Sequence, residues 1–363
     1  MDKEKTIPPY SIEYLKSYFS INSIVGCTVD CAYCFLSPLG ISPSKPRKVI
    51  DEESLVDRLE ESEFFIPHET VLSLNNRTEP FLNKFTTEST LKIMYILDQR
   101  KLRNPVTVTS KGKLSKETVS FIDNLREINP FIIVTNSGLP KEVEPLGHKG
   151  QIETMKNVRD YSERIHLLHQ FRPIIQGIND SEEVMKDVLS KAQEYCDGSI
   201  VSGLRMTQFI RDRIIKSGVK LDMPLSPDHK LMDNDFRKRV YGFIKETYPE
   251  YPIFSETSCA ISWRLDISDI NGYWSKGEEK GICDLGCPNH FNCYDRRPKP
   301  NIKKISNLLK VMNIDSKFEI KENQIFIYGS ISQEQRSYLR HKNRFPIKSS
   351  SITKSESEKV ISP

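Results

Sequence analysis

The sequence predicts an α/β fold in which parallel strands form a barrel or a partial barrel. Between residues 20 and 205, short apolar runs alternate six times with amphipathic segments. The runs are rich in β-branched and aromatic residues, as expected of strands buried on both faces, and the segments between them have helical spacing. Strand–helix alternation repeated this often is typical of parallel α/β architectures.

Each expected element follows from its local pattern. The expected strands are Ile21–Val25, Val71–Leu74, Val106–Thr109, Phe131–Val134, Leu167–Ile175 and Ser199–Ser202. The expected helices are Asp51–Glu61, Thr87–Arg100, Lys113–Leu125 and Asp180–Tyr195. Ser115 and Asp180 precede apolar residues at helical spacing, so each is predicted to cap its helix.

The composition is that of a globular protein with one large core and a smaller appended unit. Of its 363 residues, 37% are hydrophobic and 28% are charged. No apolar run approaches the roughly 18 residues of a membrane-spanning helix, and the polar N-terminus lacks the apolar stretch of a secretory signal. Eight cysteines in a chain of this length indicate reduced, metal-binding thiols, so we expect no membrane contact and a cytoplasmic protein.

Local composition divides the chain into five segments. An N-terminal extension (1–19) precedes the expected barrel (20–205), and residues 206–297 are helical and then Cys-rich. Residues 298–348 are expected to form a small α+β unit of helix, hairpin and helix. Residues 349–363 are Ser/Lys/Glu-rich and are expected to be a disordered tail.

The net charge of +4 is unevenly distributed. Residues 296–348 contain thirteen Lys or Arg against four acidic residues. Near their end, aromatic rings alternate with cations: Arg336, Tyr338, Arg340, His341, Lys342, Arg344 and Phe345. One interpretation is an interface for a phosphate-rich partner such as nucleic acid. The other is a solvated basic surface whose aromatic residues pack the small unit onto the barrel.

The strongest chemical signal is a triplet of cysteines directly after the first expected strand. Cys27, Cys31 and Cys34 have the spacing C-x3-C-x2-C. Three thiolates can ligate three irons of a [4Fe–4S] cluster and leave the fourth iron open for a cofactor or substrate. Structural zinc sites, the main alternative, close with four ligands, and no fourth candidate lies nearby in the sequence.

This motif resembles the signature of the radical S-adenosylmethionine (SAM) enzymes. The resemblance implies a partial six-stranded barrel and a [4Fe–4S] cluster whose open iron binds SAM. It also implies reductive cleavage of SAM to a 5′-deoxyadenosyl radical, which abstracts a hydrogen atom from a substrate. A reducing partner such as flavodoxin or ferredoxin would supply the electron. Tyr33 stands where the family usually has an aromatic residue near the adenine.

The turns after the second, third and fourth expected strands extend the resemblance. Asn75 and Asn76 begin a turn that is similar to the Thr-Asp-Pro-type turn of the spore-photoproduct-lyase-like subgroup, which implies carbonyl contacts to the SAM amino group. This turn lacks the glycines that most of the family has there. Ser110 and Lys111 follow the third strand and Ser137 the fourth. The resemblance implies that they meet the carboxylate or the ribose of SAM.

The fifth expected strand contributes two further candidates. The run 172–180 resembles the subgroup's Pro-(Ile/Val)-Ile-Pro-Gly-x-Asn-Asp run, with Gln176 where proline is usual. Ile175 is expected in the barrel core, and the resemblance adds a contact with adenine. Arg172 is implied to pair with a carboxylate.

A second group of cysteines follows the expected barrel: Cys259, Cys283, Cys287 and Cys293. Four thiolates can saturate an auxiliary [4Fe–4S] cluster, and such clusters follow the barrel in many radical SAM enzymes. The alternative is a zinc site made by Cys283, Cys287, His290 and Cys293.

The sequence therefore predicts a two-cluster radical SAM enzyme with an unidentified substrate. The alternative is an iron–sulfur or zinc protein that binds nucleic acid without radical catalysis, which would leave the three-cysteine motif unexplained. The sequence does not identify the substrate or the oligomeric state.

Overall fold

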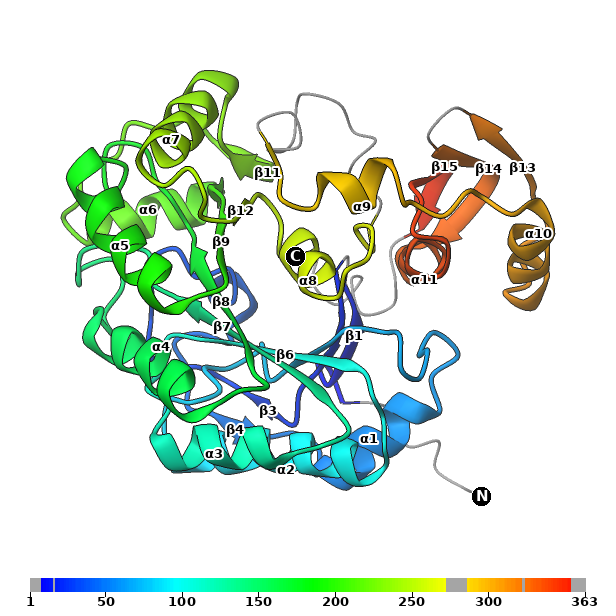
Figure 1. The fold of residues 1–363 in the computed structure, drawn as a ribbon, viewed down its shortest axis with the longest axis horizontal. Helices are drawn as coiled ribbons and strands as arrows, with labels where there is room; N and C mark the ends of the chain where they lie inside the picture. Colours follow the sequence, from blue (N-terminus) through cyan, green and yellow to red (C-terminus); the bar gives the residue numbers. More distant parts are fainter. Residues whose placement is uncertain (1–7, 16, 272–285, 322–323, 354–363) are drawn as a thin grey trace.

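The computed structural model describes residues 8–15, 17–271, 286–321 and 324–353. Its centre is an eight-stranded sheet in the order β1-β2-β5-β6-β7-β8-β9-β12 (Figure 1). The strands are β1 Ile12–Tyr14, β2 Phe19–Ile21, β5 Leu72–Leu74, β6 Pro105–Ser110, β7 Asn129–Thr135, β8 His166–Phe171, β9 Gly198–Val201 and β12 Ile253–Phe254. From β2 to β12 every neighbouring pair is parallel, and β1 is antiparallel to β2 at one edge.

The six expected strands are all present, and the parallel α/β partial barrel is confirmed. The first expected strand is divided, because Asn75 Oδ1 accepts hydrogen bonds from the amides of Ser23 (3.0 Å) and Ile24 (3.4 Å). The chain then continues as β3 (Ile24–Val25), which pairs with β4 (Arg47–Lys48) outside the main sheet. The edge strands β1 and β12 were not predicted, because each has only two or three residues and no alternation to detect.

Helices cover the outer face of the sheet. They are α1 Glu52–Glu60, α2 Lys84–Gln99, α3 Lys116–Asn124, α4 Lys149–Tyr161 and α5 Glu182–Tyr195. The predicted cap Ser115 is confirmed, since it accepts from the amide of Thr118. The predicted cap Asp180 is wrong: Ser181 caps α5, and the Asp180 carboxylate accepts from the amide of Gly177 instead. Helix α4 was not predicted from the sequence.

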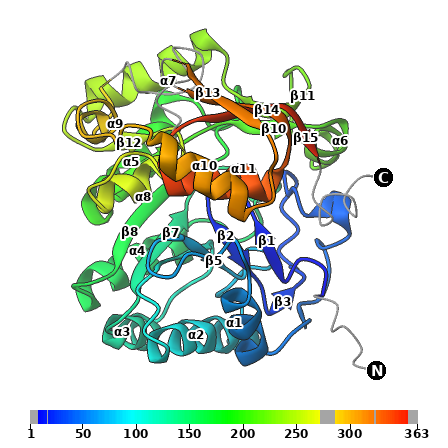
Figure 2. The ribbon, with the colours of Figure 1, turned by 90° about the vertical axis from the view of Figure 1, so that its right-hand side faces the viewer.

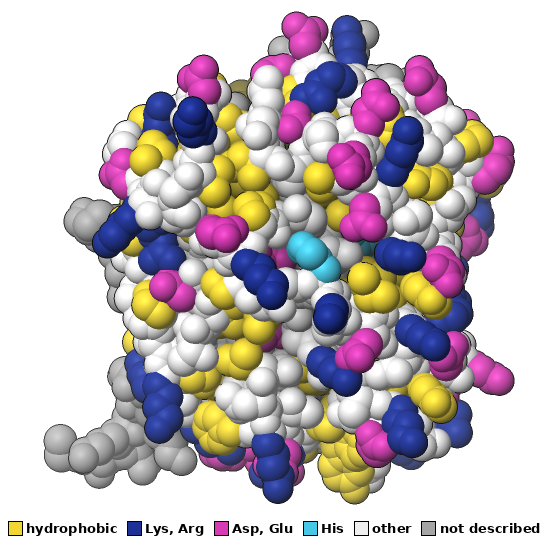
Figure 3. All heavy atoms as spheres, turned by 90° about the vertical axis from the view of Figure 1, so that its left-hand side faces the viewer, with side chains coloured by type: hydrophobic (Ala, Val, Ile, Leu, Met, Phe, Trp, Pro, Cys, Tyr) yellow, Lys and Arg dark blue, Asp and Glu magenta, His cyan; other side chains and the backbone are white. Residues whose placement is uncertain are grey.

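The outer helices pack through a large apolar cluster that includes Leu55, Ile93, Val119 and Met155. Burial of this many aliphatic side chains is the main force that holds helices on the sheet. On the face made by the helices at the left of Figure 1, cations and anions are interspersed (Figure 3). In the part of the chain that the structure describes, no helix has the length and apolarity needed to cross a membrane.

The inner face of the sheet is covered by α8 (Thr257–Arg264). Ala260 and Ile261 of this helix pack against Phe131, Leu168 and Phe254 of the strands. Arg264, at the end of α8, donates to Nδ1 of His166, the first residue of β8, at 3.1 Å. Helix α8 therefore fills the barrel and reaches its N-terminal end.

Residues 202–252 connect β9 to β12. They comprise β10 (Leu204–Met206), α6 (Gln208–Lys216), β11 (Ser226–Leu231) and α7 (Asn234–Thr247), and β10 pairs with β11. Met206, Ile210 and Ile214 form an apolar cluster with Ala32 of the cysteine loop. The expected helices are α6 and α7, whereas the pair β10–β11 was not predicted. Strands β10 and β11 with α6 form one wall of the site.

The C-terminal unit contains α9 (His290–Tyr294), α10 (Ile302–Val311), β13 (Lys317–Lys321), β14 (Gln324–Ser332), α11 (Gln333–Asn343) and β15 (Ile347–Thr353) (Figure 2). The expected helix, hairpin and helix are present. The expected tail is wrong for residues 349–353, which belong to β15 and pair in parallel with β14. The remaining expected tail, 354–363, lies outside the described residues.

Candidate functional site

The loop with the three cysteines lies at the C-terminal end of the barrel strands, as predicted. Cys27 and Cys31 are buried and Cys34 is partly exposed. Backbone hydrogen bonds shape the loop, from the Cys34 amide to Cys31 O (3.0 Å) and from the Cys27 amide to Ile41 O (3.1 Å). Burial raises the pKa of Cys27 to about 11 and that of Cys31 to about 12, and each is raised further by the charge of Cys34. The three thiols are therefore close enough to interact electrostatically.

The donor set suits an iron–sulfur cluster. A [4Fe–4S] cluster takes each protein thiolate on a different iron. Three soft sulfur donors on one loop fit that ligand set.

A buried carboxylate that the sequence analysis missed lies against this loop. The Tyr33 hydroxyl donates to Glu144 Oε2, and Lys111 Nζ lies 3.9 Å from the same oxygen and 5.6 Å from the centre of the Tyr33 ring. Burial acts to lower the pKa of Lys111, but Glu144 and the neighbouring cysteines outweigh it and raise the pKa. Glu144 therefore keeps a charged lysine beside the cysteines. It comes from the loop after β7, where no motif marks it.

A second carboxylate, Glu79, joins the loops after β5 and β6. It accepts from the Ser110 hydroxyl, and from the amides of Lys111 (3.0 Å) and Gly112 (3.2 Å). The predicted SAM contact Ser110 is thus buried and already bonded to Glu79. Glu79 fixes the backbone of Lys111 through its amide. The Lys111 ammonium lies near Tyr33 and Glu144.

The predicted pair Asn75 and Asn76 starts the turn after β5. The buried Asn75 side chain bonds the backbone at the β2–β3 junction and donates to Thr90 Oγ1 at 2.9 Å. The backbone of Asn75 has a positive φ of 48°. Asn76 Oδ1 accepts from the Ser20 hydroxyl at 2.7 Å. Both side chains are engaged within the fold, so any contact with SAM falls on the backbone of this turn.

Unpaired polar atoms gather at the C-terminal ends of the strands. They are Thr78 Oγ1, Asn136 Oδ1, Ser137 Oγ, Glu144 Oε1 and Ser202 Oγ, and each is buried without a hydrogen-bond partner in the described residues. A buried polar atom left unpaired costs about 1–3 kcal/mol. Such atoms are therefore expected to hydrogen-bond to a bound ligand or to water. Those after β7, including the predicted Ser137, suit the hydroxyls of a ribose.

Ile175 and Arg172 follow β8. Ile175 is fully buried in the apolar cluster that contains Ala32 and is packed by Tyr33, so its predicted core position is confirmed and lies beside the cysteine loop. Asn179 fixes this segment by accepting from the Ile175 amide at 2.7 Å and donating to Ser137 O at 2.5 Å. Arg172 is partly exposed.

Arg172 belongs to a group of cations on the wall made by β10 and β11. Lys230 pairs with Glu256 at 2.8 Å. Burial, followed by the charges of Arg172 and Arg205, lowers the pKa of Lys230 to about 8. Among the described side chains that act on Lys230, one carboxylate thus stands against the two cations Arg172 and Arg205.

Arg213 of α6 is a further residue that the sequence did not reveal. Its guanidinium donates to the carbonyl oxygens of Cys31 (3.1 Å) and Ala32 (3.2 Å) and to Asp30 Oδ1 (2.5 Å). These bonds attach the cysteine loop to the wall that covers it.

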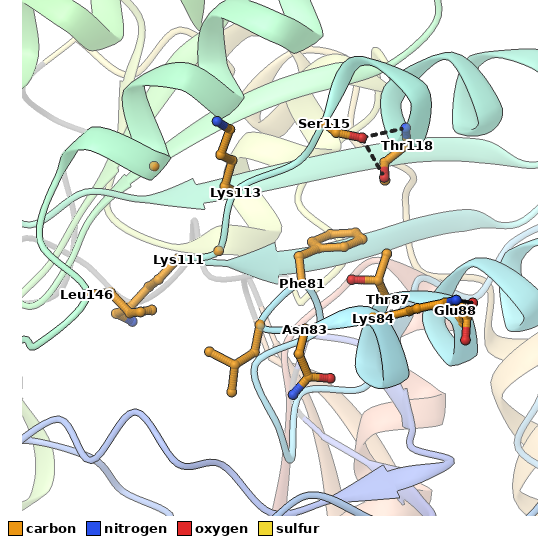
Figure 4. A pocket seen from close by; sticks show the side chains of 13 residues that line it. Phe81, Asn83, Lys84, Thr87, Glu88, Lys111, Lys113, Ser115, Thr118 and Leu146 are labelled. Carbon is orange, nitrogen blue, oxygen red and sulfur yellow. Dashed lines mark hydrogen bonds and ion pairs between the residues drawn. The ribbon is translucent and has the colours of Figure 1, made fainter.

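A pocket of about 500 Å³ opens at the same end of the barrel (Figure 4). It lies between the starts of α2 and α3, and Phe81, Asn83, Ser115 and Leu146 are among the residues that line it. Its volume is within the range of small-molecule sites. Lys111 lines this pocket and also approaches Tyr33, so the pocket adjoins the cysteine loop.

The second cysteine group is only partly described. Cys259 lies on α8 and, with Cys287, borders the apolar cluster inside the barrel. The Cys293 sulfur accepts from the Asp269 amide at 3.3 Å, and the His290 ring stacks on Tyr294. Cys283 lies outside the described residues. The auxiliary cluster and the zinc alternative therefore both stay predictions.

The basic segment of α11 is largely directed inward. Leu339 and Phe345 are buried, the Tyr338 ring contacts Phe64, and Arg340 donates to Ile347 O at 3.3 Å. Phe345 is thus not placed to stack on a base. Leu339 and Phe345 pack in the core of the C-terminal unit, and Tyr338 packs toward the barrel through Phe64. Binding of a phosphate-rich partner by the cations of this segment stays a prediction.

Comparison with known proteins gives a match in structure. No protein-family model and no curated protein matches the chain. A mutant of spore photoproduct lyase matches with a TM-score of 0.52 at 14% identity, over 69% of this chain and 79% of that one. The lyase complexed with dinucleoside spore photoproduct gives 0.51 at 13% identity, and a mutant with bound AdoMet and dinucleoside spore photoproduct gives 0.50 at 14%, both over the same shares. This chain therefore has the fold of spore photoproduct lyase.

Proposed function

We propose that this protein is a radical SAM enzyme. The observation that carries the proposal is the three-cysteine loop at the C-terminal end of a partial barrel, next to a buried, charged lysine. When bound there, a [4Fe–4S] cluster with SAM supplies reductive cleavage and the radical that abstracts a hydrogen atom. A structure of the same fold with bound AdoMet supports the choice of cofactor.

The residues of this chain would position SAM. Lys111, kept cationic by Glu144, is suited to its carboxylate. The backbone of the turn at Asn75 and Asn76 is suited to its amino group, and Asn136 and Ser137 offer unpaired oxygens to the ribose. Tyr33 and Ile175 provide ring and apolar surfaces for adenine. Helix α8 keeps water from reaching the site through the barrel.

The substrate class that we propose is an anionic molecule, with nucleic acid as the first candidate. On the wall made by β10 and β11, the cations Arg172, Arg205 and Lys230 act on one another alongside the carboxylate of Glu256, and such a cation group attracts phosphate groups. The dinucleoside ligand of the structurally similar lyase is in line with this choice. A flavodoxin or ferredoxin is proposed as the electron donor.

The decisive experiment is anaerobic reconstitution with iron and sulfide, reduction, and measurement of 5′-deoxyadenosine formed from SAM. We expect the wild type to cleave SAM and Cys31→Ala to have no activity. Cys196→Ala, which removes a buried thiol far from the motif in sequence, is the matched control and should keep the activity. Cleavage at the wild-type rate in Cys31→Ala would refute the proposal.

A further inference from the structure

The three-stranded sheet of the C-terminal unit has one covered face and one open face. Along β13 and β14, alternate residues such as Ile325 and Ile327 point into the apolar core of the unit. Because side chains alternate across a strand, Lys317, Glu319 and Lys321 of β13 lie on the opposite face. In the strand register Phe326 stands opposite Glu319 and Lys348, and Tyr328 opposite Lys317. All these residues therefore share one face of the sheet.

Two aromatic rings lie at the centre of this open face. Phe326 and Tyr328 are both on β14, the middle strand, with ring centres 4.9 Å apart at an angle of 63°. Tyr328 is 48% exposed and Phe326 is partly exposed. Rings of this size are normally buried in a small domain. Here the core of the unit lies on the other side of the sheet, so burial in that core does not account for them.

The charge around the rings is positive. Lys317, Lys321 and Lys348 are exposed, and Lys321 Nζ lies 5.4 Å from the Phe326 ring centre and 5.7 Å from that of Tyr328. The one acidic side chain among them, Glu319, accepts from the Tyr328 hydroxyl at 2.5 Å and pairs with Lys321 at 3.2 Å. Among its described residues, the face thus combines partly exposed rings with three cations and one anion.

We propose that this open face of β13, β14 and β15 binds single-stranded nucleic acid. Bases would stack on Phe326 and Tyr328, and phosphates would lie against Lys317, Lys321 and Lys348. Aromatic rings on an open sheet flanked by cations are a general way to bind unpaired bases, whereas a duplex keeps its bases stacked on one another. The site differs from the segment of α11 that composition suggested, because the rings of that segment pack inward.

The test is fluorescence anisotropy of the full-length protein with a labelled short oligothymidylate and the matching oligouridylate. Tyr328→Ala and Phe326→Ala should each weaken binding by roughly 5- to 150-fold, the range for loss of one base–aromatic stack. Tyr161→Ala is the control, since Tyr161 on α4 is also 48% exposed and should leave affinity unchanged. Replacing Lys317 and Lys348 by Gln should flatten the dependence of affinity on salt.

Three results would overturn the proposal. The first is the absence of binding to either oligonucleotide at low salt. The second is binding that survives in Tyr328→Ala and Phe326→Ala but is lost in Arg336→Gln with Lys342→Gln. The third is equal competition by a duplex. None of these measurements involves SAM or a cluster, so this proposal and the enzymatic one can fail separately.

Discussion

Arg213 shows how a single side chain can set the position of a metal-binding loop. It reaches from α6 to the backbone of Asp30, Cys31 and Ala32, and so joins segments about 180 residues apart in sequence. Hydrogen bonds from a charged donor contribute about 1.5–3 kcal/mol each. Without this guanidinium the cysteine loop would lose the hydrogen bonds that attach it to α6.

We therefore predict that Arg213→Gln lowers the iron bound after reconstitution and broadens the electron paramagnetic resonance signal of the reduced cluster. Arg211→Gln, two positions away on the same helix, is the matched control and should reconstitute normally. The same iron content and signal in Arg213→Gln and wild type would show that the loop is held by other contacts.

His169 makes the barrel sensitive to acid. It is fully buried on β8, where its ring nitrogens lie 2.8 Å from Ser199 Oγ and from Asn136 O. Burial lowers its pKa to about 4, from 6.5. Between these two values the unfolded chain binds more protons than the folded one, so stability falls as pH drops below 6.5 and approaches 4.

Because of His169, the free energy of unfolding should be about 2 kcal/mol lower at pH 5 than at pH 7. Urea unfolding at the two pH values measures the loss, and His169→Gln, which cannot take up a proton, should show a correspondingly smaller difference. Equal pH dependence in the variant and the wild type would contradict this assignment.

At the scale of elements, the features that depend on neighbouring residues in the chain were predicted from the sequence. Strands β6 to β9 and the cap at Ser115 follow from periodicity and side-chain chemistry within a few residues, and so does the cysteine loop. Glu144, Arg213 and Lys230 acquire their roles through contacts with segments distant in the chain, and a single sequence does not record those contacts. Ser110 shows the reverse case, because its position was predicted but its hydroxyl is bonded to Glu79.

Strand β15 was not predicted from its sequence. Its serine-rich composition suggested a tail, yet it completes the C-terminal sheet by pairing with β14, and Ile347 is buried in the core of the unit. A central strand that loses a neighbour exposes a row of unpaired backbone groups. We predict that a chain ending at Pro346 has a C-terminal unit that proteases digest, whereas a chain ending at Thr353 resists like the wild type. Equal digestion of the two would mean that β15 adds nothing to stability.

At the scale of the whole molecule, the amount and kind of metal per chain depend on what the second cysteine group binds. If both groups hold [4Fe–4S] clusters, iron and sulfide should each approach about eight per chain, and a variant with Cys27, Cys31 and Cys34 all replaced by Ala should keep about half. Metal analysis of anaerobically purified protein measures this. Stoichiometric zinc, with iron lost entirely in the triple variant, would favour the zinc alternative.

Helix α8, inside the barrel, also affects the route by which ligands reach the cysteine loop. Because α8 occupies the interior down to the first residue of β8, and α11 contacts β1 at the sheet edge through Tyr14 and His341, the cysteine loop is reached from the C-terminal end of the strands. In the proposed complex SAM lies against the cysteine loop, deeper on this path than the substrate. SAM should therefore bind before substrate, and 5′-deoxyadenosine should inhibit competitively against SAM but not against substrate.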